Sequence, residues 1–178
     1  MSKKVLVIST SLRHNSNSEI LAGEFAKGAK EAGHEVKEIT LRDKNIGFCK
    51  GCLACLKLGH CVIQDDAVEI AKQMHDAQVI VFATPIYYYE MSGQMKTMLD
   101  RANPLYGTDY AFEDIYFLST AAEDENGVDS RAIGVEGWID CFERAKLVGT
   151  VFAGGVDDAG AITGHTALKK AFEMGKSI

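Results

Sequence analysis

The segment CKGCLACLKLGHC, residues 49–61, holds four of the five cysteines of the chain. They follow the spacing C-x-x-C-x-x-C-x5-C and are Cys49, Cys52, Cys55 and Cys61. Four thiolates at such a spacing can complete the coordination of a [4Fe–4S] cluster. Three cysteines with His60 could instead bind zinc, although the two-knuckle arrangement typical of zinc sites is missing. Free thiols and a reversible disulfide are further alternatives, so the spacing does not decide which chemistry the segment performs.

A hydroxyl-rich turn, STSLRHNSNS, occupies residues 9–18 and lies between an apolar run and a helical pattern. Its polar side chains are Ser9, Thr10, Ser11, Arg13, Asn15, Ser16, Asn17 and Ser18. The free N–H groups of a helix N-terminus, together with hydroxyls, suit an anion and above all a phosphate. Arg13 can add a charge-assisted hydrogen bond. The alternative is a polar turn in which Ser16 or Asn17 only caps the helix. Neither the dinucleotide motif G-x-G-x-x-G nor the P-loop motif occurs here.

The segment ATPIYYYEMSGQMKTMLDR begins at the end of another apolar run and contains Thr84, Pro85, Ile86, Tyr87, Tyr88 and Tyr89. Aromatic side chains give a flat ring a surface on which to stack. The alternative is that the tyrosines cover the end of a sheet or form a subunit contact, and we expect at least one of them to lie at an interface. In the helix that follows, Lys96, Asp100 and Arg101 are expected to be surface or capping charges.

The remaining candidate residues favour structural roles. Cys141 lies beside Trp138 in a helical pattern and is expected to pack on its apolar face. The side chains of His14, His34, His75 and His165 show no ligand-like grouping, so each is expected to be solvated.

Apolar β-branched runs alternate with helical patterns along the whole chain. The predicted strands are residues 4–10, 34–41, 78–87, 114–122 and 147–156, and the predicted helices are 18–33, 65–77, 92–102, 134–146 and 165–177. Strands that alternate with helices and are apolar on both sides predict an α/β fold, a doubly wound five-stranded parallel sheet. Ligands of such sheets bind beyond the carboxyl ends of the strands, where the strand order reverses. The loops after the first, third and fourth strands are therefore the candidate site.

Composition limits the function classes. The chain has 178 residues and a formal net charge of −6, which suits a single domain over residues 1–178 and argues against nucleic acid. The apolar run 5–8 is too short for a signal peptide, and no run approaches the roughly 20 apolar residues of a membrane span. We therefore expect a cytoplasmic protein without membrane contact, in which thiols stay reduced.

Three motifs in order carry a family resemblance over about residues 4–101. STSLRHNSNS resembles the phosphate loop G-S-x-R-x-x-S-N-[S/T] of the flavodoxin-like NAD(P)H-dependent FMN reductase and iron–sulfur flavoprotein superfamily, with Thr10 and Leu12 in place of the usual glycine and proline. CKGCLACLKLGHCVIQDD is similar to the cysteine segment of that group, and TPIYYYEMSGQMKTMLDR to its P-x-Y-x-x-x-x-[S/P]-x-x-x-K-x-x-x-D-R element. An electron-carrying flavodoxin is a poorer match, because its T-x-T-G-x-T phosphate loop has no arginine.

The resemblance implies a flavodoxin-like fold with strand order 2-1-3-4-5 and FMN at the point where that order reverses. Carried over by position, the phosphate-binding residues would be Ser9, Ser11, Arg13, Ser16, Asn17 and Ser18. The flavin ring would lie against Thr84, Pro85, Ile86, Tyr87 and Tyr88, and its polar edge would meet Ser119, Thr120 and Ala121.

The function that the resemblance implies is that of an enzyme, an FMN-dependent oxidoreductase. It would move electrons from NAD(P)H to a small acceptor such as a quinone, a flavin, a nitro or azo compound or an oxidised metal. One alternative is an iron–sulfur flavoprotein that carries electrons between a ferredoxin-like partner and FMN through a [4Fe–4S] cluster on the four cysteines of 49–61. Another is a non-catalytic thiol redox sensor. A homodimer or higher homo-oligomer is expected.

Two further segments belong to these predictions. Residues 121–138 form a long acidic connection after the fourth strand, expected to lie over the flavin, to admit the nicotinamide, or to be a surface excursion. The stretch VFAGGVDDAGAITGH, residues 151–165, has no predicted place; contact with the flavin of a neighbouring subunit is one option.

Overall fold

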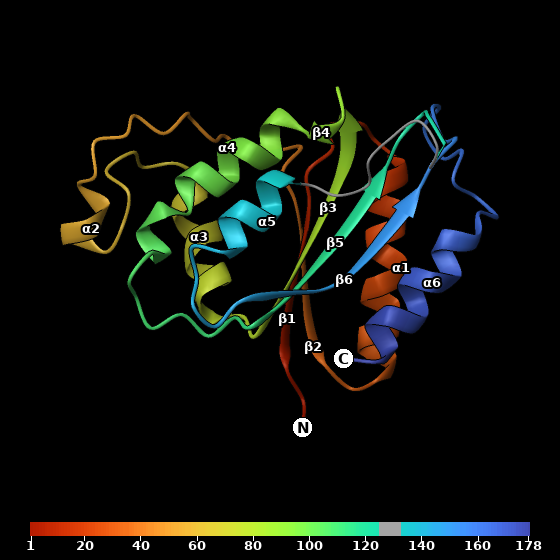
Figure 1. Ribbon diagram of the computed structural model, residues 1–178, viewed down its shortest axis with the longest axis horizontal. Helices are drawn as coiled ribbons and strands as arrows, with labels where there is room; N and C mark the ends of the chain where they lie inside the picture. Colours follow the sequence, from red (N-terminus) through yellow and green to blue (C-terminus); the bar gives the residue numbers. More distant parts are fainter. Residues whose placement is uncertain (125–132) are drawn as a thin grey trace.

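A parallel sheet forms the centre of the protein (Figure 1). The computed structural model describes residues 1–124 and 133–178. The parallel strands are β1 (Lys4–Ser9), β2 (Glu35–Thr40), β3 (Val79–Tyr87), β5 (Asp114–Thr120) and β6 (Lys146–Ala153). They pair in the order β2-β1-β3-β5-β6. Because β5 and β6 are the fourth and fifth parallel strands along the chain, the predicted order 2-1-3-4-5 is confirmed.

Helices cover both faces of the sheet, and each strand sends alternate side chains to opposite faces. The α1 helix (Asn17–Glu31) and the α6 helix (Thr166–Lys176) lie on one face, where Val5 and Val7 of β1 point. The α3 helix (Asp66–Asp76), the α4 helix (Gly93–Arg101) and the α5 helix (Ile133–Ile139) lie on the other face, where Leu6 and Ile8 point. The two short elements α2 (Cys55–Leu58) and η1 (Asn103–Leu105) belong to this second side.

The α1 and α6 helices approach one another closely because glycine lies at both contact points. A Cβ atom at Gly28 would lie 2.0 Å from the carbonyl oxygen of Phe172, and one at Gly175 would lie 2.1 Å from that of Phe25. No side chain fits at either position, so the spacing of these two helices depends on the two glycines.

A short strand, β4 (Glu90–Met91), was absent from the prediction. It pairs antiparallel with the end of β3, and the connecting turn consists of Tyr88 and Tyr89, with φ angles of 48° and 67°. Two-residue hairpin turns of type I′ require positive φ at both positions and are usually formed by Asn-Gly or Asp-Gly. A Tyr-Tyr pair carries no such signal, which is why the hairpin was missed.

The predicted helix 134–146 is wrong in its second half, because α5 ends at Ile139. The chain then tightens into turns in which Cys141 N–H donates to Trp138 O and Phe142 N–H to Ile139 O. Phe142 is buried among aromatic rings, 5.2 Å from Tyr110 between ring centroids. That burial redirects the chain at the position where helical periodicity alone predicts continuation.

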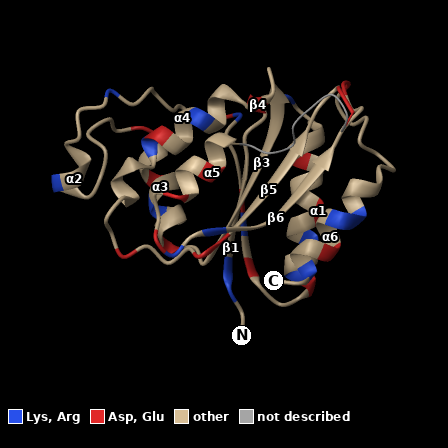
Figure 2. Cartoon of the chain, in the orientation of Figure 1, with Lys and Arg blue, Asp and Glu red and all other residues tan. Residues whose placement is uncertain are grey.

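Basic and acidic side chains are interspersed over the helices of both layers (Figure 2). Within residues 1–124 and 133–178, no helix is both long and apolar enough to cross a membrane.

Candidate functional site

The turn after β1, residues 9–18, is built into the end of the sheet rather than exposed as a flexible loop. Ser11, Ser16, Asn17 and Ser18 are all 5% exposed or less. The side chain of Ser16 caps α1 by accepting from the N–H of Glu19 at 3.2 Å. The predicted capping role of Ser16 is therefore observed. The first N–H groups of the 15-residue α1 helix have no intrahelical partner and are available to an anion.

Thr10 stands where the resembled family has glycine, and its side chain is buried beneath the turn. Its hydroxyl is fully buried and donates to Ala83 O at 3.1 Å, and it lies 3.1 Å from the hydroxyl of Ser92. Ser92 in turn bonds Thr84. The side chain thus ties the turn to β3 and to the start of α4. Leu12, the other departure, is 49% exposed and points to solvent.

Asn17 connects the turn to the loop after β6. Its side-chain amide donates to Val156 O and Asp158 O at 3.1 and 2.9 Å, and its carbonyl accepts from Ile162 N–H at 3.1 Å. The side chain of Asn17 is thereby engaged within the protein, which leaves its backbone N–H as its route to an anion.

Two arginines flank the turn. Arg13 is exposed and donates through Nη1 to Asp157 O at 2.7 Å, so it borders the mouth of the pocket described next. Arg42 lies behind the turn: it donates to Arg13 O at 2.8 Å and forms a two-point ion pair with Glu19 at 2.8 and 3.1 Å. The hydrogen bond with Glu19 raises the pKa of Arg42. Sequence reasoning missed Arg42, although its position just beyond the carboxyl end of β2 was an available signal.

A pocket of about 180 Å³ opens between this turn and the ends of β3 and β5. It brings together nine of the predicted FMN-binding residues: Ser11, Arg13, Ser16, Asn17, Ser18, Pro85, Ile86, Tyr87 and Thr120. Ala121, named with them at the polar edge of the ring, also lines it, as do Ala122, Val156 and Asp157. The segment 151–165, which had no predicted place, thus contributes to the site of its own chain.

Four of the predicted residues do not line this pocket. Ser9 and Ser119 are buried within their strands, and Thr84 is fully buried in the bonds with Ser92. Tyr88 is 99% exposed at the tip of the hairpin. Much of the predicted connection 121–138, residues 125–132, lies outside the described residues.

Ser18 indicates whether the pocket fits a phosphate. Its hydroxyl is buried and has no hydrogen-bond partner among the described residues. A buried polar group without a partner costs about 1–3 kcal/mol, so it is rarely retained without a use. Ser18, Arg13 and the start of α1 border one pocket at the reversal of strand order, and this donor set fits the phosphate of FMN.

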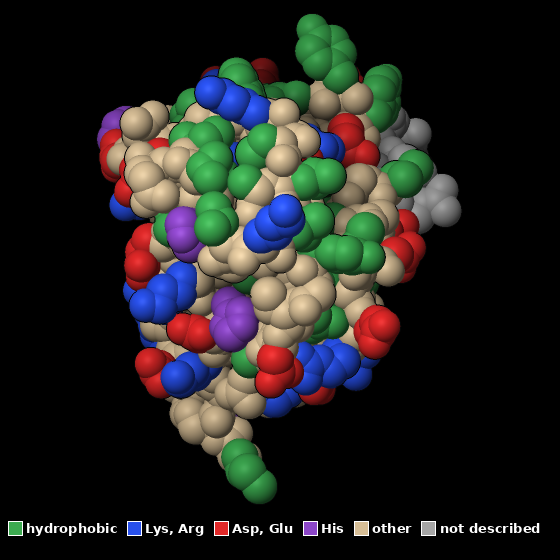
Figure 3. Space-filling view, turned by 90° about the vertical axis from the view of Figure 1, so that its left-hand side faces the viewer, with side chains coloured by type: hydrophobic (Ala, Val, Ile, Leu, Met, Phe, Trp, Pro, Cys, Tyr) green, Lys and Arg blue, Asp and Glu red, His purple; other side chains and the backbone are tan. Residues whose placement is uncertain are grey.

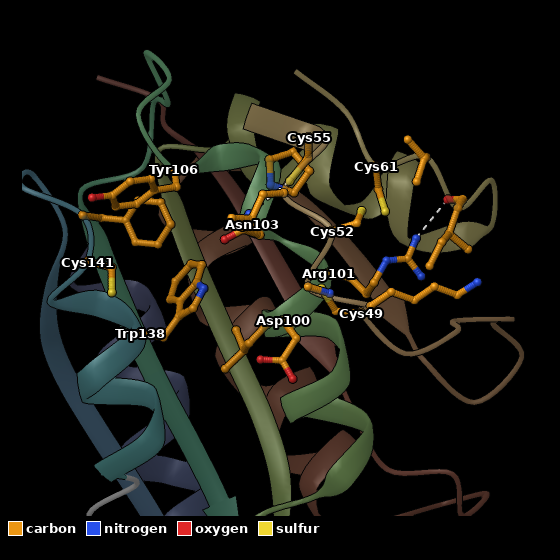
Figure 4. A pocket seen from close by; sticks show the side chains of 18 residues that line it. Cys49, Cys52, Cys55, Cys61, Asp100, Arg101, Asn103, Tyr106, Trp138 and Cys141 are labelled. Carbon is orange, nitrogen blue, oxygen red and sulfur yellow. Dashed lines mark hydrogen bonds between the residues drawn. The ribbon is translucent and has the colours of Figure 1, made fainter. Parts of the chain in front are cut away.

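The cysteine segment, residues 49–61, borders a second and larger pocket of about 440 Å³ (Figure 4). All five cysteines line it, together with Tyr106, Trp138 and Phe142. The predicted packing role of Cys141 is wrong: it is exposed, because α5 ends before it, and it lies on the opposite wall from Cys52 and Cys61.

The four segment thiols share this pocket without meeting at one point. Cys49 and Cys52 are exposed, Cys55 and Cys61 are half-buried, and all are free thiols. Asn103 Nδ2 donates to Cys55 Sγ at 3.0 Å. In the part of the chain that the structure describes, no three His, Cys, Asp or Glu side chains converge to hold a metal ion. The ligand types fit a [4Fe–4S] cluster or zinc, but their present placement does not form either site.

The segment also presents an apolar surface to solvent. Figure 3 shows apolar side chains gathered on the upper part of the face that carries α2. The exposed apolar residues there are Phe48, Leu53, Leu56, Leu58, Val62 and Tyr106.

Arg101 corrects the prediction for the charges of α4. Lys96 and Asp100 are surface charges, as expected, and pair at 2.6 Å. The Arg101 side chain is instead fully buried and bonds Asp65 at 2.6 and 2.8 Å. Burial alone would raise the pKa of Asp65, but the hydrogen bonds from Arg101 and from the N–H groups of Gly47 and Ala67 hold it below its usual value. A charged arginine can be buried here because the negative charge of Asp65 compensates its positive charge.

The solvated role predicted for four histidines is confirmed for some of them only. His14 is exposed, whereas His34 is half-buried between Lys3 N–H and Ile178 O. His75 pairs with Asp76 at the surface, and His165 caps α6. The solvated role predicted for His34 and His165 is therefore incomplete, since both bond the backbone.

Solved structures of a quinone oxidoreductase and of an azoreductase share this architecture. An NAD(P)H:quinone oxidoreductase from Methanothermobacter marburgensis aligns with a TM-score of 0.74 and 18% identity, covering 99% of this chain and 97% of that one. An azoreductase from Bacillus anthracis str. Sterne aligns with a TM-score of 0.75 and 17% identity over 100% of both chains. At these identities the likeness shows the fold alone, and it supports the predicted flavodoxin-like fold.

Curated relatives are similar along the sequence. Two of them are named iron-sulfur flavoproteins: one from Archaeoglobus fulgidus is 29% identical over 178 residues, 98% of this chain and 78% of that protein. The other, from Methanosarcina thermophila, is 28% identical over 173 residues, 96% of this chain and 87% of that protein. Against two more similar iron-sulfur flavoproteins, at 39% and 41% identity, the match spans only about half of their length, 53% and 49%.

The family model described as NADPH-dependent FMN reductase matches residues 3–130, which include the turn 9–18, the cysteine segment and the hairpin of β3 and β4. The family resemblance read from the three motifs is confirmed. This chain belongs to the NADPH-dependent FMN reductase family.

Proposed function

We propose that this protein is an FMN-dependent oxidoreductase that takes electrons from NAD(P)H and passes them to a small acceptor, such as a quinone, a flavin or a nitro or azo compound. The observation that carries the proposal is the unpaired buried hydroxyl of Ser18, a residue that lines one pocket together with Arg13 and the start of α1. When bound, FMN supplies the hydride chemistry, and the protein supplies binding and orientation.

Each wall of the pocket has a separate task in this proposal. Ser18, Arg13 and the N–H groups of α1 bind the phosphate dianion, supported from behind by Arg42. Pro85 and Tyr87 present a stiff and an aromatic surface to one side of the flavin ring. Thr120 and the loop at Val156 close the other side. No acid or base side chain of this pocket is needed, since the cofactor carries the reaction.

Ser18→Ala tests the phosphate site through two effects of opposite sign. Removing an unpaired buried hydroxyl should leave the free energy of unfolding of the FMN-free protein unchanged or raise it by up to about 1 kcal/mol. The same change should weaken FMN binding about 5- to 10-fold, since one hydrogen bond to the phosphate is lost. Arg13→Ala should weaken FMN binding by about 10-fold or more, because a charge-assisted contact is lost.

The measurements are urea unfolding of the FMN-free protein and quenching of FMN fluorescence on binding. Ser177→Ala is the matched control: this serine is exposed at the end of α6 and bonds only Met174 O, so FMN affinity should be unchanged. If the wild-type chain stays colourless in excess FMN, or if Ser18→Ala destabilises the protein and leaves FMN affinity unchanged, the phosphate site is wrong.

NADPH and NADH oxidation by the FMN-loaded protein, with and without a quinone, tests the catalytic part of the proposal. We expect oxidation that depends on bound FMN and accelerates with the acceptor. If the protein binds FMN but oxidises neither nicotinamide, the proposed FMN site stands and the proposed electron donor is rejected.

A second candidate function is electron transfer through a [4Fe–4S] cluster held by the cysteine segment. Two observations favour it: the four segment thiols line one pocket, and the relatives aligned over nearly the whole chain are named iron-sulfur flavoproteins. Purification without oxygen, followed by assay of iron and acid-labile sulfide, should give close to four of each per chain. If both iron and sulfide are absent, the remaining alternative for the segment is a thiol redox sensor. A sensor should change its oligomeric state when its thiols are oxidised, without bound flavin.

The exposed hairpin of Tyr87, Tyr88 and Tyr89 supports the proposal of a homodimer, because exposed aromatic side chains are enriched at interfaces. Sedimentation equilibrium of the wild-type protein and of Tyr88→Ser/Tyr89→Ser tests it. A dimer that the double substitution leaves intact would place the interface elsewhere.

A further inference from the structure

The cysteine segment is attached to the rest of the protein mainly at its two ends. Within residues 48–62, all side chains are exposed or half-buried. Backbone hydrogen bonds of α2 and its flanking turn, such as Gly59 N–H to Cys55 O, stay inside the segment. Among the described residues, the hydrogen bond that ties its interior to another element is the one from Asn103 to Cys55. The shape of the segment therefore depends on what holds its ends.

One side chain holds both ends. Arg101 Nη1 donates to Gly47 O at 2.8 Å, just before the segment, and Arg101 Nη2 donates to Ile63 O at 3.0 Å, just after it. The same two nitrogens bond the two carboxylate oxygens of Asp65 at 2.6 and 2.8 Å. Asp65 in turn accepts from Gly47 N–H at 2.9 Å. We call this pair, Arg101 with Asp65, the Arg101–Asp65 clasp.

The clasp is buried and lies directly at the thiols. Its two side chains are 0% and 6% exposed. Figure 4 shows Cys61 beside Arg101. The hydrogen bond that Arg101 donates to Asp65 raises the pKa of Arg101 most, and Cys61 raises it further. Arg101 itself lines the 440 Å³ pocket with the five cysteines. Its place at the end of α4, which packs in the core through Met98 and Leu99, fixes it relative to the sheet.

The four acceptors of Arg101 lie in a pattern that only a guanidinium can satisfy. One N–H of each Nη nitrogen matches an oxygen of the carboxylate, and the other N–H of each points to a carbonyl, of Gly47 or of Ile63. The buried Nε–H has no partner among the described residues. A lysine keeps the charge but concentrates it at one point, so it cannot bridge Gly47 O, Ile63 O and Asp65 together.

We propose that the Arg101–Asp65 clasp is the positioning device of the cysteine segment: by joining Gly47 to Ile63 it closes the segment and presents Cys49, Cys52, Cys55 and Cys61 to one pocket. Arg101 is a positioning residue and takes no part in electron transfer. Any thiophilic metal centre that needs several of these thiols at once depends on the clasp. The inference deepens the second candidate function and rests on it only for the identity of that centre.

The experiment compares Arg101→Lys, Arg101→Gln and the wild-type protein without bound metal. Trypsin cleaves after Lys50 and Lys57, which are both exposed within the segment. Cleavage there should accelerate by about tenfold or more in both variants, as the loss of a charge-assisted hydrogen bond predicts. Co²⁺ added without oxygen reports the thiols through its thiolate charge-transfer absorption, and its affinity should fall by a similar factor. FMN affinity should stay within about twofold of the wild-type value, because the clasp lies outside the 180 Å³ pocket.

A control variant separates a local effect from a global loss of stability. Phe25→Leu or Phe25→Ala removes volume from the core on the opposite face of the sheet. The one whose urea midpoint matches that of Arg101→Lys should leave cleavage at Lys50 and Lys57 unchanged. Should the Arg101 variants not fold, Asp65→Glu gives the comparison, since it keeps the counter-charge of Arg101 but displaces the carboxylate from the N–H of Gly47.

Any one of three results would overturn the inference. The first is cleavage of the segment in Arg101→Lys at the wild-type rate. The second is cleavage in the matched Phe25 variant as fast as in Arg101→Lys, and the third is unchanged Co²⁺ affinity in both Arg101 variants. Failure of the proposed function looks different. A wild-type protein that takes up neither FMN nor iron would reject the proposed activity, while the trypsin comparison would still decide whether the clasp positions the segment.

Discussion

The turn 9–18 and the cysteine segment 49–61 follow neighbouring strands, β1 and β2, yet they are held in opposite ways. In the turn, the buried side chains of Thr10 and Asn17 bond β3 and the loop after β6, and the backbone carbonyl of Arg13 accepts from Arg42. The cysteine segment is largely exposed and is fixed at its ends by the Arg101–Asp65 clasp. The polar groups of the turn are fixed by bonds within the protein, whereas the thiols of the segment line one pocket without converging on one point.

The difference follows from the chemistry of each ligand. A phosphate needs several N–H and O–H donors at fixed positions, which a helix N-terminus and bonded hydroxyls provide without rearrangement. A metal centre contributes strong bonds of its own, and its binding free energy can order the segment that supplies the thiolates. A rigid cysteine segment is therefore unnecessary, provided that its ends are set at the correct separation.

The largest effect is expected from Asp65→Asn, which leaves the guanidinium of Arg101 buried without its counter-charge. Removing one partner of a buried ion pair costs about 3–5 kcal/mol of unfolding free energy at neutral pH. Urea unfolding measures it. A cost under about 1 kcal/mol would show that the ends of the segment are not held by the clasp, and the contrast between the two regions would then lose its basis.

The same pair predicts a pH dependence. The pKa of Asp65 is lower in the folded protein than in the unfolded chain, where it is about 3.9. Its contribution to stability is therefore complete above about pH 5 and is lost as the pH falls below about 4 and through the folded pKa. The stability difference between the wild-type protein and Asp65→Asn should be constant at neutral pH and shrink in acid. A difference that grows on acidification would contradict the depressed pKa.

How much of this could be read from the sequence differs between the two regions as well. The serines, Arg13 and the following helix lie next to one another in the chain, so the local pattern predicts a phosphate site, and the structure brings most of these residues to one pocket. The strand order followed from the resemblance and is confirmed by the pairing. What holds the cysteine segment was not predictable, because Arg101 and Asp65 are 36 residues apart and each taken alone reads as a surface charge.

Cys141 and the Tyr88–Tyr89 hairpin were missed for a related reason. Helical periodicity continues past Ile139, and only the burial of Phe142 against Tyr110 ends the helix before Cys141. Likewise, only the pairing of Glu90 with Tyr87 forces two tyrosines into positive φ. In both cases a long-range or cross-strand contact overrides the local preference.

A smaller effect is expected from Asn17→Ala in the turn. The substitution removes three hydrogen bonds to the loop at 156–162 and leaves buried backbone groups unpaired, which should cost about 2–3 kcal/mol of unfolding free energy. FMN affinity should fall as well, because Val156 and Asp157 line the pocket. Urea unfolding and FMN titration measure the two losses. Loss of stability without loss of affinity would mean that the loop after β6 is not part of the FMN site.

The smallest effect is expected inside the cysteine segment. Cys52 is exposed and has no hydrogen bond within the described residues, so Cys52→Ser should change the unfolding free energy of the metal-free protein by less than about 0.5 kcal/mol. Cys55→Ser is the matched variant, because Cys55 is half-buried and accepts from Asn103; it should cost slightly more, up to about 1 kcal/mol. Urea unfolding without oxygen gives both values. A cost above about 2 kcal/mol at Cys52 would mean that the segment is packed as firmly as the turn 9–18, and the contrast between the two regions would fail.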